Sequence, residues 1–260
     1  MTRALRYVLA ATTAALFATG MCLLLHETRQ QRARYDCKEI DVIFEDSLRF
    51  VSEAEIRAYI SEEYGTAVGE RLDSVGLSRI EEILVSKSAI MDAQAWTTDD
   101  GTLHVGVTQR APALRFENNG KGFYVDDRGF IFPLHESYTA PVRAISGNIP
   151  VRVEEGFKGE APQEADRNWI AGMLNLDSFI SGSRVWRDSV DEITVLDGGD
   201  ISFRTSRGEE EIILGSFHSL ADKFSALEKY YGVIAPQKGD EHYSKVILKY
   251  KKQIICRKDM

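Results

Sequence analysis

The chain has 260 residues, of which 43% are hydrophobic and 28% are charged, and these values are ordinary for a protein that buries a core. They exclude wholesale disorder and a collagen-like sequence. The formal net charge of -8 argues against a nucleic-acid-binding protein, which needs a basic surface. Five arginines and two acidic residues give residues 1–36 a net charge of +3, so the rest of the chain carries -11.

An uncharged, apolar stretch covers residues 7–25 near the N-terminus. A helix of about 20 residues spans the hydrocarbon core of a bilayer, so we predict a transmembrane helix over this range. It follows a cytoplasmic N-terminus of residues 1–6 and precedes a basic juxtamembrane linker of residues 26–36. Long domains cross the membrane largely regardless of flanking charge, so we expect the body outside the cytoplasm.

Two alternatives to an uncleaved membrane anchor stay open. A cleaved signal peptide could end near the small residues 18–20, although further apolar residues follow them. A lipid could be attached to Cys22, although the bulky Met21 before this cysteine disfavours a lipoprotein.

Residues 37–112 are expected to form one domain of five elements. Ser52 and Glu55 have the spacing of a capping box at the start of the first helix. Leu103, Val105 and Val107 alternate as in a half-buried strand. The predicted order is strand, helix, helix, strand, strand, over residues 38–44, 52–64, 77–87, 90–97 and about 103–109.

Residues 113–260 are expected to form a second domain of short strands and tight turns. Turn signals at residues 118–120 and 126–129 separate the first of these strands. Helices are predicted at residues 164–180 and 216–231, and one long apolar strand at Tyr243–Cys256. The predicted fold class is therefore α+β: a transmembrane helix, the five-element domain, and a mixed domain dominated by an antiparallel sheet with two helices.

Motifs for catalysis or cofactor binding are missing from the sequence. No glycine-rich phosphate loop, His-Glu-x-x-His or Gly-x-Ser-x-Gly occurs, and the five histidines lack ligand spacing. Asp126 and Asp127 fall in a predicted turn, and Glu209–Glu211 is expected to be a solvated edge. We therefore predict a protein that is not an enzyme and has no cofactor, metal ion, nucleic acid or small-molecule substrate.

Cys37 and Cys256 lie near opposite ends of the body, and the third cysteine lies in the predicted span. The two could form a disulfide in an oxidising compartment, or they could be two small buried side chains. No Cys-x-x-Cys spacing indicates a metal site.

Basic residues gather at the end of this otherwise acidic body, at Lys249, Lys251, Lys252, Arg257 and Lys258. They surround the apolar terminal strand. A strand at a chain end is often a sheet edge, and an exposed edge can accept a partner strand. Alternatively, the lysines only block aggregation between edges. The residues alone favour neither reading.

Three local motifs resemble the FtsQ (DivIB) family of cell-division proteins: Phe50-Val51-Ser52, the V-x-x-R-x-P pattern of residues 107–112, and the Y-V-D-x-x-G pattern of residues 124–129 with a later Ile145-Ser146-Gly147. With one N-terminal span, the strand-helix-helix-strand-strand module resembles the POTRA domain of that family. The likeness covers nearly the whole chain and is weakest at residues 148–187. The motif positions that it marks as the POTRA exit or as structural are Gln109, Arg110, Pro112, Tyr124, Asp126, Gly129 and Gly147.

The resemblance implies a bitopic scaffold of the division machinery in the inner membrane, with its body in the periplasm at the septum. Such a scaffold links early and late division proteins during septal peptidoglycan synthesis. Its second domain would bind FtsB/FtsL-like partners through the last strands. Its POTRA domain would contact other division proteins, and residues 7–25 would contact membrane lipid.

Residues 246–250 match the family's terminal V-x-L-R-Y strand, with Lys in place of Arg. By this match, Lys249 would be the cation that faces a partner acid, and Tyr250 an apolar anchor. The later isoleucines would extend the docking edge. The partner-binding residues that the resemblance implies are Val246, Leu248, Lys249, Tyr250, Lys252, Ile254 and Ile255.

The main alternative is a POTRA-containing, membrane-anchored factor in outer-membrane protein assembly or secretion. Proteins of that class usually carry repeated POTRA modules, whereas one module is found here. An anchored extracytoplasmic enzyme is a third hypothesis, and the missing catalytic motifs disfavour it.

Overall fold

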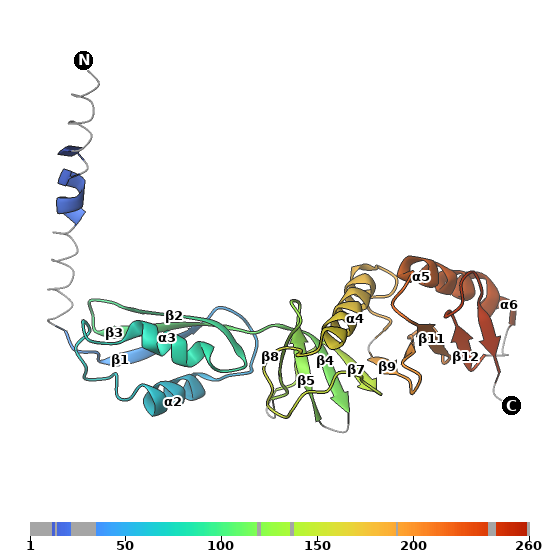
Figure 1. The fold of residues 1–260 in the computed structure, drawn as a ribbon, viewed down its shortest axis with the longest axis horizontal. Coiled ribbons are helices and arrows are strands. Elements are labelled where there is room, and N and C mark those ends of the chain that lie inside the picture. The colour runs from blue at the N-terminus through green and yellow to red at the C-terminus, as the bar shows by residue number, and fades with distance from the viewer. Residues whose placement is uncertain are drawn as a thin grey trace, which may run out of the picture. The chain divides into compact units, whose positions relative to one another are not determined.

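A computed structural model describes residues 12–13, 15–21, 35–118, 121–135, 138–190, 192–238 and 243–258. Its contacts divide the chain into two compact units, Met1–Gln109 and Arg110–Met260. Both units are drawn in Figure 1.

Most of the predicted span, residues 7–25, lies outside the described residues, as do residues 1–6 and most of 26–36. The described parts of the span, residues 12–13 and 15–21, are helical. Within the ranges that the structure describes, no helix is both long enough and apolar enough to cross a membrane.

The first unit combines a three-stranded sheet with two helices in the predicted order. Its elements are β1 (Glu39–Phe44), α2 (Glu53–Glu63), α3 (Leu77–Val85), β2 (Ile90–Thr97) and β3 (Thr102–Gln109). Strand β3 lies in the middle of the sheet, parallel to β1 and antiparallel to β2. Leu103, Val105 and Val107 of β3 are fully buried, because one face of the sheet packs against α2 and α3 (Figure 1).

The first helix begins where its capping residues predict. The Ser52 hydroxyl accepts a hydrogen bond from the Glu55 backbone N–H at 3.3 Å, and the Glu55 carboxylate accepts one from the Ser52 N–H at 2.8 Å. These two bonds satisfy N–H groups that a helix start leaves without a partner. Ile56 and Ile60 are buried, and the helix ends before Gly65, whose φ of 111° suits glycine.

The second unit is built on one ten-stranded sheet with the strand order β13-β12-β11-β10-β9-β7-β4-β5-β6-β8. The strands are β4 (Pro112–Asn118), β5 (Lys121–Asp126), β6 (Phe130–Pro133), β7 (Arg143–Gly147), β8 (Gly159–Glu160), β9 (Glu192–Val195), β10 (Ile201–Phe203), β11 (Glu211–Gly215), β12 (Lys245–Ile247) and β13 (Ile255–Arg257). The helices are α4 (Glu164–Gly182), α5 (Leu220–Lys229), the π-helix η1 (Tyr230–Ile234) and α6 (Ala235–Lys238).

This sheet is mixed, and antiparallel pairs outnumber parallel ones, as predicted. The pairs β4–β7, β7–β9 and β11–β12 are parallel, and the other neighbours are antiparallel. Parallel neighbours need a crossover of a dozen or more residues. Helix α4 lies in the crossover from β7 to β9, and α5, η1 and α6 lie in the crossover from β11 to β12.

The helix predicted at residues 216–231 of the second domain differs from the structure at both ends. It begins at Leu220, because Ser219 adopts a left-handed conformation with φ of 55° that no α-helix contains. After α5 the chain continues through η1 and α6, so that helical structure extends to Lys238. A π-helical turn inside a helix is rare and occurs frequently at functional sites.

The core of the second unit lies between its sheet and its helices. Helix α4 contributes the predicted Met173 and Leu176, both fully buried, whereas Trp169 packs against the core while partly exposed. Trp186, which is 1% exposed, has its ring centroid 5.7 Å from that of Phe224 on α5. This packing supports the C-terminal strands from one side of the sheet.

Candidate functional site

The C-terminal segment forms two strands, so the prediction of one strand over Tyr243–Cys256 is wrong. Strand β12 lies between β11 and β13, and β13 is the end strand of the sheet order. Lys245 is opposite Arg257 and Ile247 is opposite Ile255 in the antiparallel register of β12 and β13. The chain reverses between them, where Lys252 has a left-handed φ of 60°.

The burial of the seven predicted partner-binding residues separates them into two groups. Val246 and Leu248 are 0% and 2% exposed and belong to the core, which corrects their assignment to a partner surface. They are two residues apart, so their side chains lie on the same face of the sheet, the one that packs in the core. Tyr250 is 52% exposed and Lys252 is exposed, while Ile254 and Ile255 are partly buried.

Lys249 already faces an acid of its own chain. Its Nζ lies 2.7 Å from Oδ2 of Asp200, which follows the turn before β10. The hydrogen bond to Asp200 raises the pKa of Lys249. A partner acid at this position would compete with Asp200.

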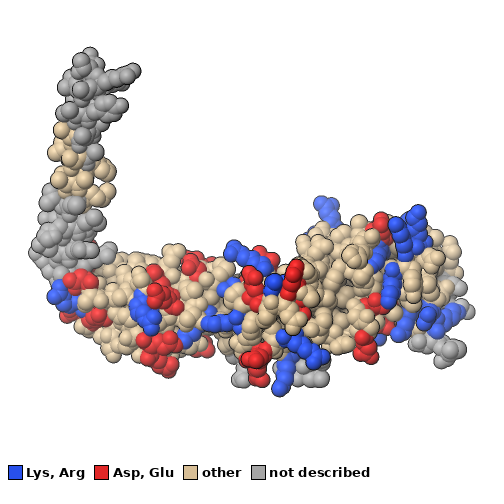
Figure 2. Space-filling model, in the orientation of Figure 1, with Lys and Arg blue, Asp and Glu red and all other residues tan. Residues whose placement is uncertain are grey.

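The segment from residue 243 to 258 contains six basic residues and no acidic residue. Lys245 pairs with Glu211 at 3.1 Å, and Lys249 with Asp200. The structure gives no ion pair for Lys251 or Lys252 among the residues that it describes, and both are exposed. Figure 2 shows basic side chains gathered over the end of the second unit that holds α5 and β12 in Figure 1.

A buried polar cluster beside the C-terminal strands was not predicted. Glu210 is 3% exposed, so the expectation that Glu209–Glu211 forms a solvated edge is wrong at this position. Its Oε1 has no hydrogen-bond partner among the described residues. The hydroxyls of Tyr231 on η1 and Thr205 lie 2.7 Å apart. Burial and the nearby Glu210 carboxylate raise the pKa of Tyr230, and burial raises that of Tyr231. The only available sequence signal was the Tyr-Tyr pair at the end of a helix.

Gln109 is buried and holds the chain between β1 and α2 in place. Its side-chain amide donates to Oδ1 of Asp46 and to the carbonyl of Leu48, each at 2.8 Å. Its side-chain oxygen accepts a bond from the Val51 N–H at 3.0 Å. These contacts assign Gln109 a structural role within the first unit.

Arg110 and Asp126 form a partly buried ion pair within the second unit. The Arg110 guanidinium lies 2.8 Å from Oδ2 of Asp126 and stacks over the Phe130 ring at 3.8 Å. Oδ1 of Asp126 accepts bonds from the N–H groups of Arg128 and Phe130, both at 2.9 Å. The two motif residues therefore fix the turn that precedes β6, next to Pro112 at the start of β4.

The other motif residues also have structural roles. The Tyr124 hydroxyl accepts a hydrogen bond from the Ala140 N–H at 3.1 Å, and its ring stacks on Phe132. Gly129 and Gly147 have φ of 85° and 88°. A Cβ added to Gly147 would lie 2.3 Å from the carbonyl oxygen of Val195, so only glycine fits there.

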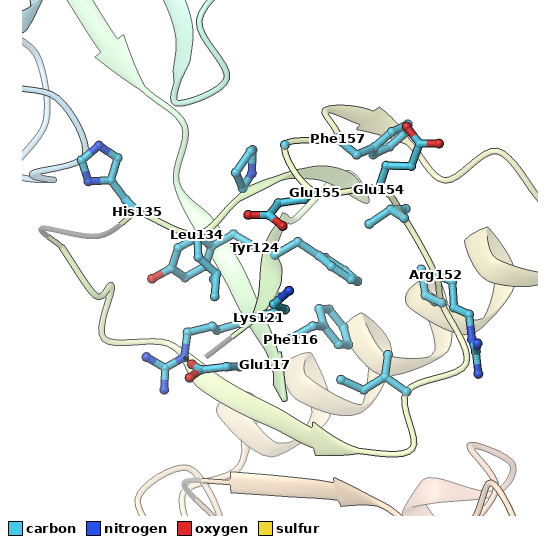
Figure 3. Close-up of a pocket in the computed structure, with 18 of the residues that line it drawn as sticks. Phe116, Glu117, Lys121, Tyr124, Leu134, His135, Arg152, Glu154, Glu155 and Phe157 are labelled. Atoms are coloured by element: carbon cyan, nitrogen blue, oxygen red, sulfur yellow. Dashed lines mark ion pairs between the residues drawn. The ribbon is translucent and has the colours of Figure 1, made fainter. Parts of the chain in front are cut away.

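A cavity of about 1020 Å³ lies beside β4 and β5 and the loop that follows β7 (Figure 3). Phe116 and Tyr124 contribute aromatic rings, and Arg152, Glu154 and His135 add charged or polar groups. The strands that line it belong to the β8 end of the sheet order, away from β13. Within the described ranges, no group of three or more His, Cys, Asp or Glu side chains could hold a metal ion.

Cys37 is a buried thiol in the first unit, where burial raises its pKa, and Cys256 is a partly buried thiol on β13. Both are thiols in the structure. Val246 of β12 is the register partner of Cys256.

Two family models match this chain. Residues 35–108 match the POTRA-like domain, which corresponds to the sheet and helices of the first unit. Residues 111–257, more than half of the chain, match the family described as FtsQ/DivIB, C-terminal related, and this match includes β12 and β13. No curated protein matches the chain. The chain therefore has a POTRA-like domain and belongs to the FtsQ/DivIB, C-terminal related family.

Proposed function

We propose that this chain is a scaffold of the bacterial cell-division machinery that binds FtsB/FtsL-like partners through the β13 edge of its second unit. In this proposal, residues 7–25 anchor it in the inner membrane, and both units lie in the periplasm at the septum. The observation that carries the proposal is the place of β13 at the end of the sheet order, beside an exposed cluster of basic residues.

The β13 edge suits the addition of a partner strand. An end strand presents backbone N–H and C=O groups on the side away from its neighbour, and a partner strand can pair with them. Ile254 and Ile255 are partly buried at this edge and can be covered further by a partner side chain. Main-chain pairing would supply affinity, and apolar contacts at alternate positions would supply specificity.

The charge of the segment favours an acidic partner. Lys251, Lys252 and Arg257 are exposed at or beside the edge. Opposite charge at the rim of an interface raises the association rate and selects the partner more than it raises affinity. Tyr250 is the exposed aromatic side chain of the turn and is suited to act as an anchor.

The proposal is tested by co-purification of FtsB/FtsL-like proteins with the full chain from membranes. The double variant Tyr250→Ala with Ile254→Asp should reduce recovery of both partners, because it removes the anchor and places a charge at the edge. Val185→Asp is the matched control, since Val185 is a similarly exposed apolar residue outside the strands of the sheet, between α4 and β9. Undiminished recovery with the double variant would show that the docking site lies elsewhere.

The cellular role needs a separate test. Depletion of the protein should give filamentous cells, and a reporter fused after the second unit should be active only outside the cytoplasm. Loss of outer-membrane proteins without filamentation would instead support the assembly or secretion alternative.

A further inference from the structure

One face of the three-stranded sheet in the first unit packs against α2 and α3, and we call the other face the open face. Because β1 pairs with β3 and β3 pairs with β2, residues that are opposite each other form three rows of side chains across this face. Side chains on this face alternate with the buried positions of each strand. The open face consists of Glu39, Asp41, Ile43 and Glu45 from β1 and the residue after it, Asp92, Gln94 and Trp96 from β2, and Thr102, His104, Gly106 and Thr108 from β3.

The open face is acidic. It carries four carboxylates, and the three strands contain no lysine or arginine. These carboxylates are exposed, whereas Arg57 and Lys87 of this unit pair with acids of α2. Among the residues that the structure describes, no lysine or arginine forms an ion pair with these four carboxylates, so the face can attract a cationic partner.

An exposed tryptophan lies across the middle of this acidic face. Trp96 is 41% exposed, and its ring stacks on His104 with centroids 5.3 Å apart and planes at 16°. A Cβ added to Gly106 would lie 3.3 Å from the Trp96 ring, so the ring extends over that glycine. Ile43, which is 40% exposed, is opposite Gly106 on the other side.

Hydrogen bonds hold this row of side chains in place. Nδ1 of His104 lies 3.0 Å from Oδ2 of Asp41, and Nε2 lies 3.1 Å from the Thr98 hydroxyl. The Thr108 hydroxyl donates to Glu45 at 2.9 Å. Side chains that are already ordered lose little conformational entropy when a partner binds, so this surface is pre-organised for recognition.

We propose that the open face binds a segment of a partner protein that contains lysine or arginine, with its cations between the Trp96 ring and the neighbouring carboxylates. A cation over an indole face is attracted by the ring quadrupole, and arginine also stacks on it. Exposed tryptophans at the centre of a surface are typical anchors of interfaces. An anionic membrane would be repelled by the four carboxylates. The proposal concerns the first unit alone and does not depend on the function of β13.

The full chain labelled with 5-fluorotryptophan allows a direct test by fluorine NMR. Trp96, Trp169 and Trp186 give three resonances, and Trp186 is buried while Trp169 packs against the core of the second unit. The probe is a synthetic peptide of alternating arginine and serine. It should shift the Trp96 resonance in a saturable way and leave the other two in place, and raising the ionic strength from about 0.05 to about 0.5 M should weaken binding.

Two variants and a control keep this test decisive. Asp41→Asn with Glu45→Gln should weaken peptide binding roughly three- to ten-fold, because two surface charges are lost. Ile43→Lys adds a cation without removing a hydrogen bond and should weaken binding similarly. Glu53→Gln with Glu62→Gln on α2 is the matched control and should bind like the unaltered chain.

The proposal is overturned if a peptide of alternating glutamate and serine shifts Trp96 equally, or if both face variants bind like the control. A Trp96 resonance that moves with protein concentration alone would mean that a second copy covers the face. A shift with anionic lipid vesicles would assign it to the membrane. Either result would also overturn the proposal, while the β13 edge would keep its own separate test.

Discussion

The open face of the first unit and the β13 edge of the second unit are opposite in charge and differ in what they offer a partner. The open face presents side chains on a sheet whose central strand, β3, is paired on both sides. The edge presents backbone groups of a strand paired on one side, next to long lysines. Side-chain substitutions should therefore abolish recognition at the open face more readily than at the edge, where backbone pairing persists.

The largest expected change in unfolding free energy distinguishes a core residue near the β13 edge from an exposed residue near it. Leu248→Ala should lower the free energy of unfolding by about 2–5 kcal/mol, because Leu248 is fully buried and its truncation leaves a cavity. Tyr250→Ala should change it by less than about 0.5 kcal/mol, since Tyr250 is exposed. Urea denaturation of the two variants measures both values, and equal losses would contradict the assignment of Leu248 to the core alone.

Alkaline pH should destabilise the second unit through its buried tyrosines. The pKa of Tyr230 is raised above the usual 10.0, so the folded chain keeps a proton that the unfolded chain releases. The free energy of unfolding should fall as the pH rises above about 10, by up to about 1.4 kcal/mol per pH unit for one group. Tyr230→Phe should flatten this dependence in denaturation measured at several pH values. An unchanged slope would show that Tyr230 ionises alike in both states.

The first unit should respond to the loss of its helix cap without any effect on β13. Ser52→Ala removes one half of the capping box and should cost about 1 kcal/mol of unfolding free energy. The rate of hydrogen exchange of the backbone amides should rise in α2 and stay constant in β12 and β13. Faster exchange at β13 in this variant would mean that the units do not unfold separately.

The smallest effect is expected at the exposed ion pair beside the edge. Lys249→Met removes its contact with Asp200, and a surface pair contributes little and is screened by salt. Because the pKa of Lys249 is raised, the pair is present below its usual pKa of 10.5 and is lost as the pH rises through the raised value. The unfolding temperature at neutral pH should therefore fall slightly at low salt and stay unchanged at high salt. A large fall at high salt would contradict this account.

Local patterns predicted much of the first unit. The alternation of Leu103, Val105 and Val107 and the Ser52–Glu55 spacing are short-range signals, and the structure has β3 and α2 at these places. The row formed by Asp41, His104 and Trp96 could not be predicted, because it depends on the register between strands that are distant in the sequence.

The second unit shows where such patterns fail. Residues 243–256 have the apolar, β-branched composition of one strand, and nothing in them indicates that Lys252 adopts a left-handed backbone. The reversal there makes β12 an inner strand and β13 the end strand, and Val246 and Leu248 lie on the face that packs in the core. The burial of Glu210 likewise depends on helical residues that follow it in the chain.

Hydrogen exchange of the full chain, alone and with its FtsB/FtsL-like partners, tests the central claim most directly. Pairing of a partner strand should slow exchange of backbone amides in β13, Ile255–Arg257, because their outward groups become hydrogen-bonded. Strand β8, at the other end of the sheet order, should exchange at the same rate in both samples. Partner binding that leaves β13 unchanged, or that protects β8 instead, would contradict the account.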